Sequence, residues 1–414
     1  MKFIANGVEK QNNVVLLLLF ALFGLGLTAH VQNLSYFLLL IAAFAALLNK
    51  SADDTSFYDL YRAYRPLHWA MASLLLALVL TQTCHGYIDL SPYNPLARLA
   101  TFLPLLWTIR KLQIDKLRLL KWSWVAGAAL CAIQIYFYPK FDDRPDIENW
   151  YVALASLLGI FSILSLALED RPTVLSRLAH LGGGAGGLYV IYVCQTRDVW
   201  IALPLFVMAA YLTFVNNPFS VKKIVLFLSG VLLSGALFFS TDLVQRRVQQ
   251  AEHDIRVYSI NKNADTSIGT RFQLWEASWI MIKEHPLIGV GTGAHYKEAV
   301  REMVNRKILP TYYNGAHSHN EILFSTATMG IPGLIALLLT YLVPGHYFAR
   351  HLLDPDRQVR AAAAIGFCTC IGFLIFGVAD VLFKYKECEV FYCVACAAAF
   401  ALMTNRKKQL AGLS

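Results

Sequence analysis

Stretches of about 20 mostly apolar residues recur along this 414-residue chain and alternate with short polar segments. A helix of that length is long enough to cross the hydrocarbon core of a bilayer. The fold class is therefore expected to be all-α and polytopic, embedded in membrane lipids. The pattern predicts twelve membrane-spanning helices, at 13–29, 34–48, 66–84, 96–109, 121–138, 149–168, 178–195, 197–214, 224–241, 319–345, 360–380 and 387–403.

One long polar segment, residues 242–318, interrupts this alternation ahead of the tenth predicted span. Within it, Thr270-Arg271-Phe272-Gln273 has the pattern of a capping box and predicts a helix start, and Glu284-His285-Pro286 predicts the end of that helix. The glycines of 289–293 predict a turn, and 295–307 a second amphipathic helix. We expect 1–414 to be a single transmembrane domain that carries 242–318 as a large helical loop.

The distribution of positive charge indicates which side of the membrane this loop faces. If the N-terminus lies inside, the inner connections carry twenty of the 36 Lys and Arg residues, the short outer connections six, and 242–318 the other ten. Inner connections of membrane proteins are enriched in Lys and Arg, so both termini are predicted to be cytoplasmic and the loop to face outward. Because the net charge of +9 follows this bias, we expect no nucleic-acid partner.

A charged or titratable residue follows a predicted helix cap at three outer positions. Arg197 follows Thr196, Arg271 follows Thr270, and His319 follows Ser318, with Glu321 completing a capping box. Helix N-termini attract anions, and guanidinium groups bind phosphate in a bidentate manner. The same positive potential favours a neutral imidazole, the form that a general base requires. The pattern favours an anion site beside a base, although capped helix starts with polar residues are also common structural features.

Several neighbouring residues allow more than one interpretation. His317 and His319 form a His-x-His pair that can chelate a metal, but the sequence shows no further Asp/His cluster to support it, and we expect neither metal nor cofactor. Tyr312 and Tyr313 can stack on sugar rings or lie at the membrane interface. The glycines of 182–187 in the seventh predicted span favour close helix packing.

The chain resembles a known family at these residues. His319-Asn320, followed after nine residues by Gly330-x-x-Gly333, is similar to the signature of the O-antigen ligases of lipopolysaccharide assembly. O-antigen polymerases and protein O-oligosaccharyltransferases belong to the same superfamily. The resemblance extends to about twelve spans, cytoplasmic ends and one large periplasmic loop late in the sequence. Arg197 and Arg271 match the essential arginines of the family, whereas Leu334-Ile335 stands where some members have threonines.

The resemblance implies a membrane glycosyltransferase of the GT-C class in the inner membrane of a Gram-negative bacterium. It would transfer preassembled O-antigen from undecaprenyl diphosphate to a sugar hydroxyl of lipid A–core, on the periplasmic side and with inversion. Arg197 and Arg271 would bind the diphosphate, and His319 would deprotonate the acceptor. Because two arginines can replace a divalent ion at the diphosphate, metal independence is expected. The expected substrate-binding residues are Arg197, Arg271, His317, Asn320, Tyr312 and Tyr313.

Other functions stay open at this point. A polymerase of the same superfamily would use the same donor and differ in its acceptor, and a protein O-oligosaccharyltransferase would be expected to have a larger outer region. A transporter or lipid flippase belongs to a different class. A transporter or flippase would be expected to have ionisable residues deep within its spans, or two repeated halves with helix breaks. The predicted spans of this chain are almost free of deep charges.

Overall fold

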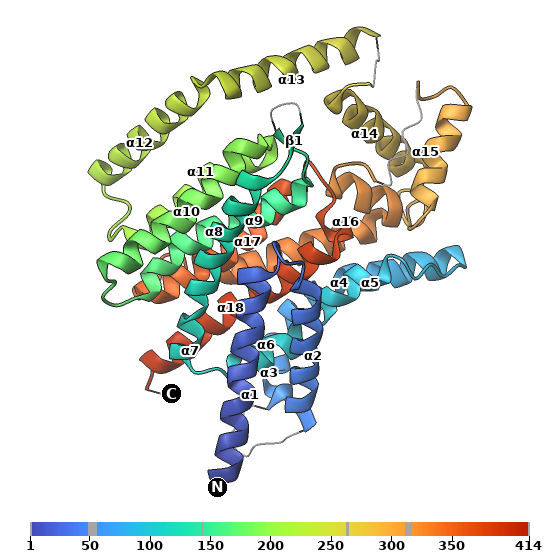
Figure 1. Ribbon diagram of the computed structural model, residues 1–414. Helices are drawn as coiled ribbons and strands as arrows, with labels where there is room; N and C mark the ends of the chain where they lie inside the picture. Colours follow the sequence, from blue (N-terminus) through green and yellow to red (C-terminus); the bar gives the residue numbers. More distant parts are fainter. Residues whose placement is uncertain (1, 49–55, 142–143, 262–264, 311–316, 413–414) are drawn as a thin grey trace.

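The computed structural model describes residues 2–48, 56–141, 144–261, 265–310 and 317–412, and these are almost entirely helical (Figure 1). The two strands form a single antiparallel pair of two residues each. The elements in chain order are α1 (Lys2–Phe20), η1 (Ala21–Leu25), α2 (Gln32–Leu48), α3 (Phe57–Ala63), α4 (Arg65–His85), α5 (Tyr93–Ala100), α6 (Phe102–Arg110), α7 (Ile114–Arg118), α8 (Leu120–Phe137), β1 (Lys140–Phe141), β2 (Arg144–Pro145), α9 (Asn149–Ser165), η2 (Leu166–Leu168), α10 (Val174–Cys194), α11 (Arg197–Phe214), α12 (Val221–Phe239), α13 (Asp242–Asn261), α14 (Ser267–Glu284), α15 (His295–Asn305), α16 (Glu321–Ala349), α17 (Arg357–Phe376), η3 (Leu382–Lys384) and α18 (Lys386–Leu410).

Eight helical segments among the described residues are long and apolar enough to cross a membrane, which confirms a polytopic helical membrane protein. They are Arg65–His85, Ile114–Phe137, Asn149–Leu168, Arg197–Phe214, Val221–Phe239, Glu321–Ala349, Arg357–Phe376 and Lys386–Leu410. The other four predicted spans coincide with α1 and η1, α2, α5 and α6, and α10. The total of twelve spans therefore stays a prediction.

The centre of the bundle is α18, whose apolar stretch is 94% buried among α17, α6 and α5. By contrast, α12 lies at the edge of the bundle, beyond α11, and has no buried residue (Figure 1). Gly183, Gly184 and Gly187 of α10 pack closely against α9, as predicted. A Cβ atom on Gly187 would lie 2.8 Å from the Cα of Gly159, and one on Gly183 would lie 2.3 Å from Ser162 Oγ. Small residues therefore set the spacing of these helices.

The predicted inner connections meet at one end of the bundle. Lys121 forms an ion pair with Glu169 at 2.7 Å, and Arg406 forms one with Asp356 at 2.8 Å. Asp356 also caps the start of α17 by accepting hydrogen bonds from the backbone N–H groups of residues 358 and 359. Because α17 runs from Arg357 to Phe376, the loop that follows its last residue lies at the opposite end of the bundle.

The segment 242–310 forms helices α13, α14 and α15, and the last two are packed onto α16. Buried Leu274, Met281, Tyr296 and Val300 of α14 and α15 form one apolar cluster with Ala327 of α16. The predicted end of α14 at Glu284 is confirmed, with His285 as its C-cap. The loop segment is therefore held to the tenth predicted span by a small apolar core of its own.

Helix α16 is broken at Gly330, where φ is 65° and ψ is −158°. The glycine-containing loop between α14 and α15 docks against this break. The N–H groups of Val290 and Gly291 donate to the carbonyl oxygens of Ala327 and Thr328 at 2.8 and 3.1 Å, and the N–H of Ile331 donates to Pro286 O at 2.9 Å. A Cβ on Gly330 would lie 2.4 Å from Leu287 O. This first glycine of the predicted signature thus permits both the break and the close approach of the loop.

Candidate active site

The histidine pair lies just before α16, because the helix begins later than predicted. The predicted cap Ser318 is wrong: Asn320 is the N-cap, its side chain accepts a hydrogen bond from Leu323 N, and Glu321 is the first helical residue. Ser318 Oγ bonds instead to the backbone N–H and C=O of Asn320, which forms a turn. His319 therefore precedes the helix, with φ of 50°.

Glu321 and Asn320 attach the start of α16 to the loop between α17 and α18. The buried Glu321 carboxylate accepts hydrogen bonds from Tyr341 Oη at 2.5 Å and Phe383 N at 2.7 Å, which explains why it does not complete a capping box. The N–H of Glu321 donates to Gly377 O at 2.6 Å, and Asn320 Nδ2 donates to Val378 O at 3.1 Å. This attachment brings residue 380 beside the histidines.

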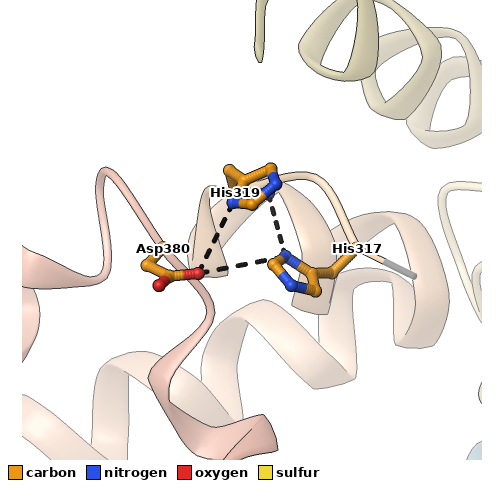
Figure 2. A group of neighbouring side chains, drawn as sticks. All are labelled: His317, His319 and Asp380. Carbon is orange, nitrogen blue, oxygen red and sulfur yellow. Dashed lines mark hydrogen bonds and ion pairs between the residues drawn. The ribbon is translucent and has the colours of Figure 1, made fainter. Parts of the chain in front are cut away.

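Asp380 completes a cluster with His317 and His319 (Figure 2). Its Oδ1 lies 3.6 Å from His319 Nδ1 and 4.0 Å from His317 Nδ1, and Val381 N donates to the same oxygen at 2.8 Å. His317 Nδ1 also accepts from His319 N at 3.3 Å. Asp380 and His317 are buried, whereas the His319 side chain is 35% exposed. With Nδ1 directed at Asp380, the Nε2 atom of His319 is the ring nitrogen left for a ligand.

The surroundings of Asp380 and His317 fix their protonation states. Burial opposes ionisation of Asp380, but His319 and the Val381 N–H outweigh it, so the pKa of Asp380 lies below its ordinary value. Burial, followed by the positive charge of Lys384, lowers the pKa of His317. A carboxylate therefore stands beside an uncharged His317 ring at neutral pH.

Asp380 was not among the residues predicted from the sequence. Its position affects the interpretation of both catalysis and metal binding at this site. Asp380 is the last residue of the predicted span 360–380, next to the outer connection that contains Lys384, and this position at a span end is the only sequence signal that points to it. Ligand atoms of His317, His319 and Asp380 all lie within 4.8 Å of one another, which is compatible with a metal ion. The expectation that no further acidic group accompanies the His-x-His pair was therefore wrong.

Arg197 is the first residue of α11, as predicted, and Thr196 is the N-cap by position. The Thr196 side chain makes no capping hydrogen bond, however, and its hydroxyl points back to Cys194 O at 3.5 Å. Arg197 is half-buried, and its charge interacts with those of Asp254, Arg271 and Arg144. Three arginines from separate segments thus share one electrostatic environment.

Arg271 lies in the second turn of α14, because the cap predicted at Thr270 is wrong. The helix begins at Ser267, and Thr266 is the N-cap, accepting a hydrogen bond from Gly269 N at 3.0 Å. Thr270 donates its hydroxyl to Thr266 O instead. Of the three residues predicted to stand first in a helix, only Arg197 does so. Helix N-termini therefore do not account for the anion site at Arg271 or His319.

Charge interactions still connect the arginines to the histidine cluster. Asp198, buried beside Arg197, interacts with both Arg271 and Asp380. Across the described part of the chain, no carboxylate lies within ion-pair distance of the Arg197 or Arg271 guanidinium. Two half-buried guanidiniums without close counter-charges are suited to an anionic ligand. Asn320 serves as a cap, and Tyr312 and Tyr313 lie outside the described residues.

Comparisons with known proteins find similarity to one family over part of the chain. An uncharacterized protein of Haemophilus influenzae is 25% identical to this chain over 330 residues, which cover 77% of this chain and 80% of that protein. An O-antigen ligase of Escherichia coli is 26% identical over 158 residues, 37% of each chain. Residues 183–338 match the family model of the O-antigen ligases, and this range contains Arg197, Arg271, His319 and Gly330. Residues 183–338 of this chain are therefore similar to the O-antigen ligase family.

Proposed function

We propose that this protein is an O-antigen ligase of a Gram-negative inner membrane, acting on the periplasmic side. It transfers a preassembled glycan from undecaprenyl diphosphate to a sugar hydroxyl of lipid A–core. The observation that carries the proposal is the His319–Asp380 pair, because His319, Arg197 and Arg271 all lie inside the region that matches the family and Asp198 interacts electrostatically with both Asp380 and Arg271. The family supports lipid-linked glycans as substrates in general, and the specific donor and acceptor are part of the proposal.

The transfer is a single displacement. The acceptor hydroxyl oxygen attacks the anomeric carbon of the donor glycan, and the bond from that carbon to the diphosphate oxygen breaks. The diphosphate leaves with the electron pair, and the hydroxyl proton moves to His319 Nε2. Attack opposite to the leaving group inverts the anomeric configuration. A positioned base of this kind contributes about 10²–10⁴-fold to the rate.

Asp380 and the arginines supply the electrostatics of this step. Asp380, 3.6 Å from His319 Nδ1, orients the ring and stabilises the imidazolium that forms. Arg197 and Arg271 bind the diphosphate and offset the charge that develops on the leaving oxygen. Because the guanidiniums fill the role of a divalent ion, the reaction is proposed to be metal-independent, and His317 and His319 act without a bound ion.

The test is transfer by purified protein in liposomes containing an undecaprenyl-diphosphate glycan and lipid A–core. His319→Ala is expected to lower transfer at least about 100-fold, whereas His253→Ala, at an exposed histidine of α13, leaves it unchanged. Arg271→Lys keeps the charge but loses the bidentate geometry and is expected to raise the KM for the donor, with Arg256→Lys as its control. Transfer by His319→Ala at the wild-type rate would show that His319 is not the general base.

Two further measurements distinguish a ligase from a polymerase and a metal-independent reaction from a metal-dependent one. Joining of glycan units to a second undecaprenyl-linked glycan, with lipid A–core left unused, would make the protein a polymerase. Loss of transfer in EDTA, restored by a divalent ion, would show that the His317, His319 and Asp380 cluster holds a catalytic metal and that metal independence is wrong.

A further inference from the structure

A cavity lies beside the candidate active site, and the proposed binding of a lipid diphosphate by Arg197 and Arg271 does not explain it. It has a volume of about 480 Å³ and lies between the first turns of α16, the middle of α4, residues 91–96, the loop at 292–293 and residues 381–387. Its walls are mainly apolar and aromatic, with Leu74, Leu78, Phe324, Met329, Phe383 and Tyr385 among them. Neither Arg197 nor Arg271 lines it.

The cavity shares two of its walls with the histidine cluster. The His317 ring lies with its centroid 6.4 Å from that of Phe324 and 6.5 Å from that of Tyr385, and both aromatic residues line the cavity. Val381, another lining residue, directly follows Asp380. The histidine cluster therefore adjoins this cavity, and its Asp380 also interacts electrostatically with Asp198, which in turn interacts with Arg271.

Charged residues in the lining, Lys384, Lys386, Glu321 and Glu387, distinguish the cavity from an ordinary lipid-filled gap. Lys384 lines it, is exposed, and forms no ion pair within 4 Å with any residue that the structure describes. Its charge acts on His317 and is attracted by Asp380 and Glu148. Lys386, also in the lining, is 4.0 Å from Glu387, and Glu387 in turn accepts a hydrogen bond from Asn33. Lys384 is thus the cation that remains free to bind an anionic ligand.

We propose that this cavity binds the acceptor, a glycolipid whose sugar carries a phosphate or carboxylate group, and that Lys384 binds that anionic group. The aromatic side chains of Phe324 and Tyr385 pack against the sugar ring and direct its hydroxyl towards His319. The inference rests on the proposed function for the identity of the reaction. It adds that donor and acceptor occupy separate sites, with Arg197 and Arg271 on the donor and Lys384 on the acceptor.

The first experiment measures KM for each substrate separately in Lys384→Gln. The KM for phosphorylated lipid A–core is expected to rise about tenfold, the loss of one charge-assisted contact of about 1.4 kcal/mol. The KM for the donor is expected to stay unchanged, and with a phosphatase-treated acceptor the variant and wild type become equal. Lys283→Gln, at an exposed lysine of α14, is the control. A rise in donor KM would place Lys384 in the diphosphate site, and unchanged KM values for both substrates would also overturn the proposal.

The second experiment measures binding without turnover. Fluorescent lipid A–core is titrated against the His319→Ala protein in the absence of donor, with and without the additional change Ser91→Trp. Ser91 is an exposed loop residue that lines the cavity, so the tryptophan fills space with little risk to folding. Weaker acceptor binding with Ser91→Trp supports the cavity as the acceptor site, and equal binding refutes it. If wild-type protein transfers no glycan and still binds the acceptor here, the proposed function fails while the binding site stands.

Discussion

The broken helix α16 provides the most direct test of how the sequence builds the site. In Gly330→Ala, the added Cβ would lie 2.4 Å from Leu287 O, 2.5 Å from Leu287 C and 2.6 Å from Ile288 N, all backbone atoms that cannot rotate away. The φ of 65° with ψ of −158° belongs to a region populated almost only by glycine. The variant must therefore either strain this residue or release the loop that precedes α15.

The loss of folding stability in Gly330→Ala can be worked out from those contacts. A strained backbone conformation costs about 1–3 kcal/mol. Three loop-to-helix hydrogen bonds, each worth about 1 kcal/mol, are lost if the loop moves away. Either outcome therefore costs roughly 1–3 kcal/mol of folding stability. Because Arg271 lies on the α14 side of this loop and His319 on the α16 side, glycan transfer is expected to fall together with stability.

The assay is the melting temperature of the detergent-solubilised protein, combined with glycan transfer in liposomes. Gly182→Ala is the matched control, since a Cβ there meets no atom within 4 Å and alanine favours a helix by about 0.5–1 kcal/mol relative to glycine. The control is expected to melt at or above the wild-type temperature. If Gly330→Ala melted and transferred like wild type, the docking of the loop at the break would not depend on glycine, and the reasoning would be refuted.

Three further predictions concern the surroundings of the site. Asp380→Asn removes the charge that orients His319, so kcat is expected to fall by about 10-fold or more with little change in either KM, and Asp380→Glu is expected to recover part of it. In metal-free buffer, the melting temperature is expected to fall as the pH drops below 6.5. Burial lowers the pKa of His317 in the folded state, so only the unfolded state gains a proton in this range, and stability is lost at up to about 1.4 kcal/mol per pH unit. His317→Gln should remove this dependence of the melting temperature on pH. Tyr87→Phe leaves the Thr292 N–H without its 2.6 Å acceptor and should destabilise the loop by about 1–3 kcal/mol, measured by thermal unfolding.

The helical membrane fold could be predicted because hydrophobic length has a direct physical meaning. Runs of about 20 apolar residues form helices in a bilayer whatever their partners are, and the predicted spans all coincide with helices. The start of α11 at Arg197 and the end of α14 at Glu284 were also predicted correctly. These boundaries depend on residues that are close in the sequence.

Capping boxes were less reliable because side chains near a helix start can find better partners elsewhere. Glu321 bonds with Tyr341, twenty residues later, and with Phe383 across the bundle, instead of turning back to Ser318. The sequence alone offers no means to rank those distant partners above the local one. The helix consequently starts at Glu321, and His319 adopts a left-handed backbone conformation ahead of it.

The composition of the site was only partly predictable for the same reason. His319, Arg197 and Arg271 were identified by motif and resemblance, which are local in sequence. Asp380 lies 61 residues after His319, and only folding shows that the two side chains meet. A carboxylate paired with a histidine across that separation carries no sequence pattern of its own.

The hydrogen bonds that join the start of α16 to residues 377–383 have a mechanical consequence. His319 and Asp380 are carried by two backbone segments that are bonded to each other through Glu321 and Asn320, so the proposed base and its carboxylate are expected to move as one rigid body. Arg271, in contrast, sits on a helix that joins this body through an apolar cluster and a single docked loop. An opening that admits a long lipid-linked glycan is therefore expected to displace Arg271 and to leave the His319–Asp380 pair intact.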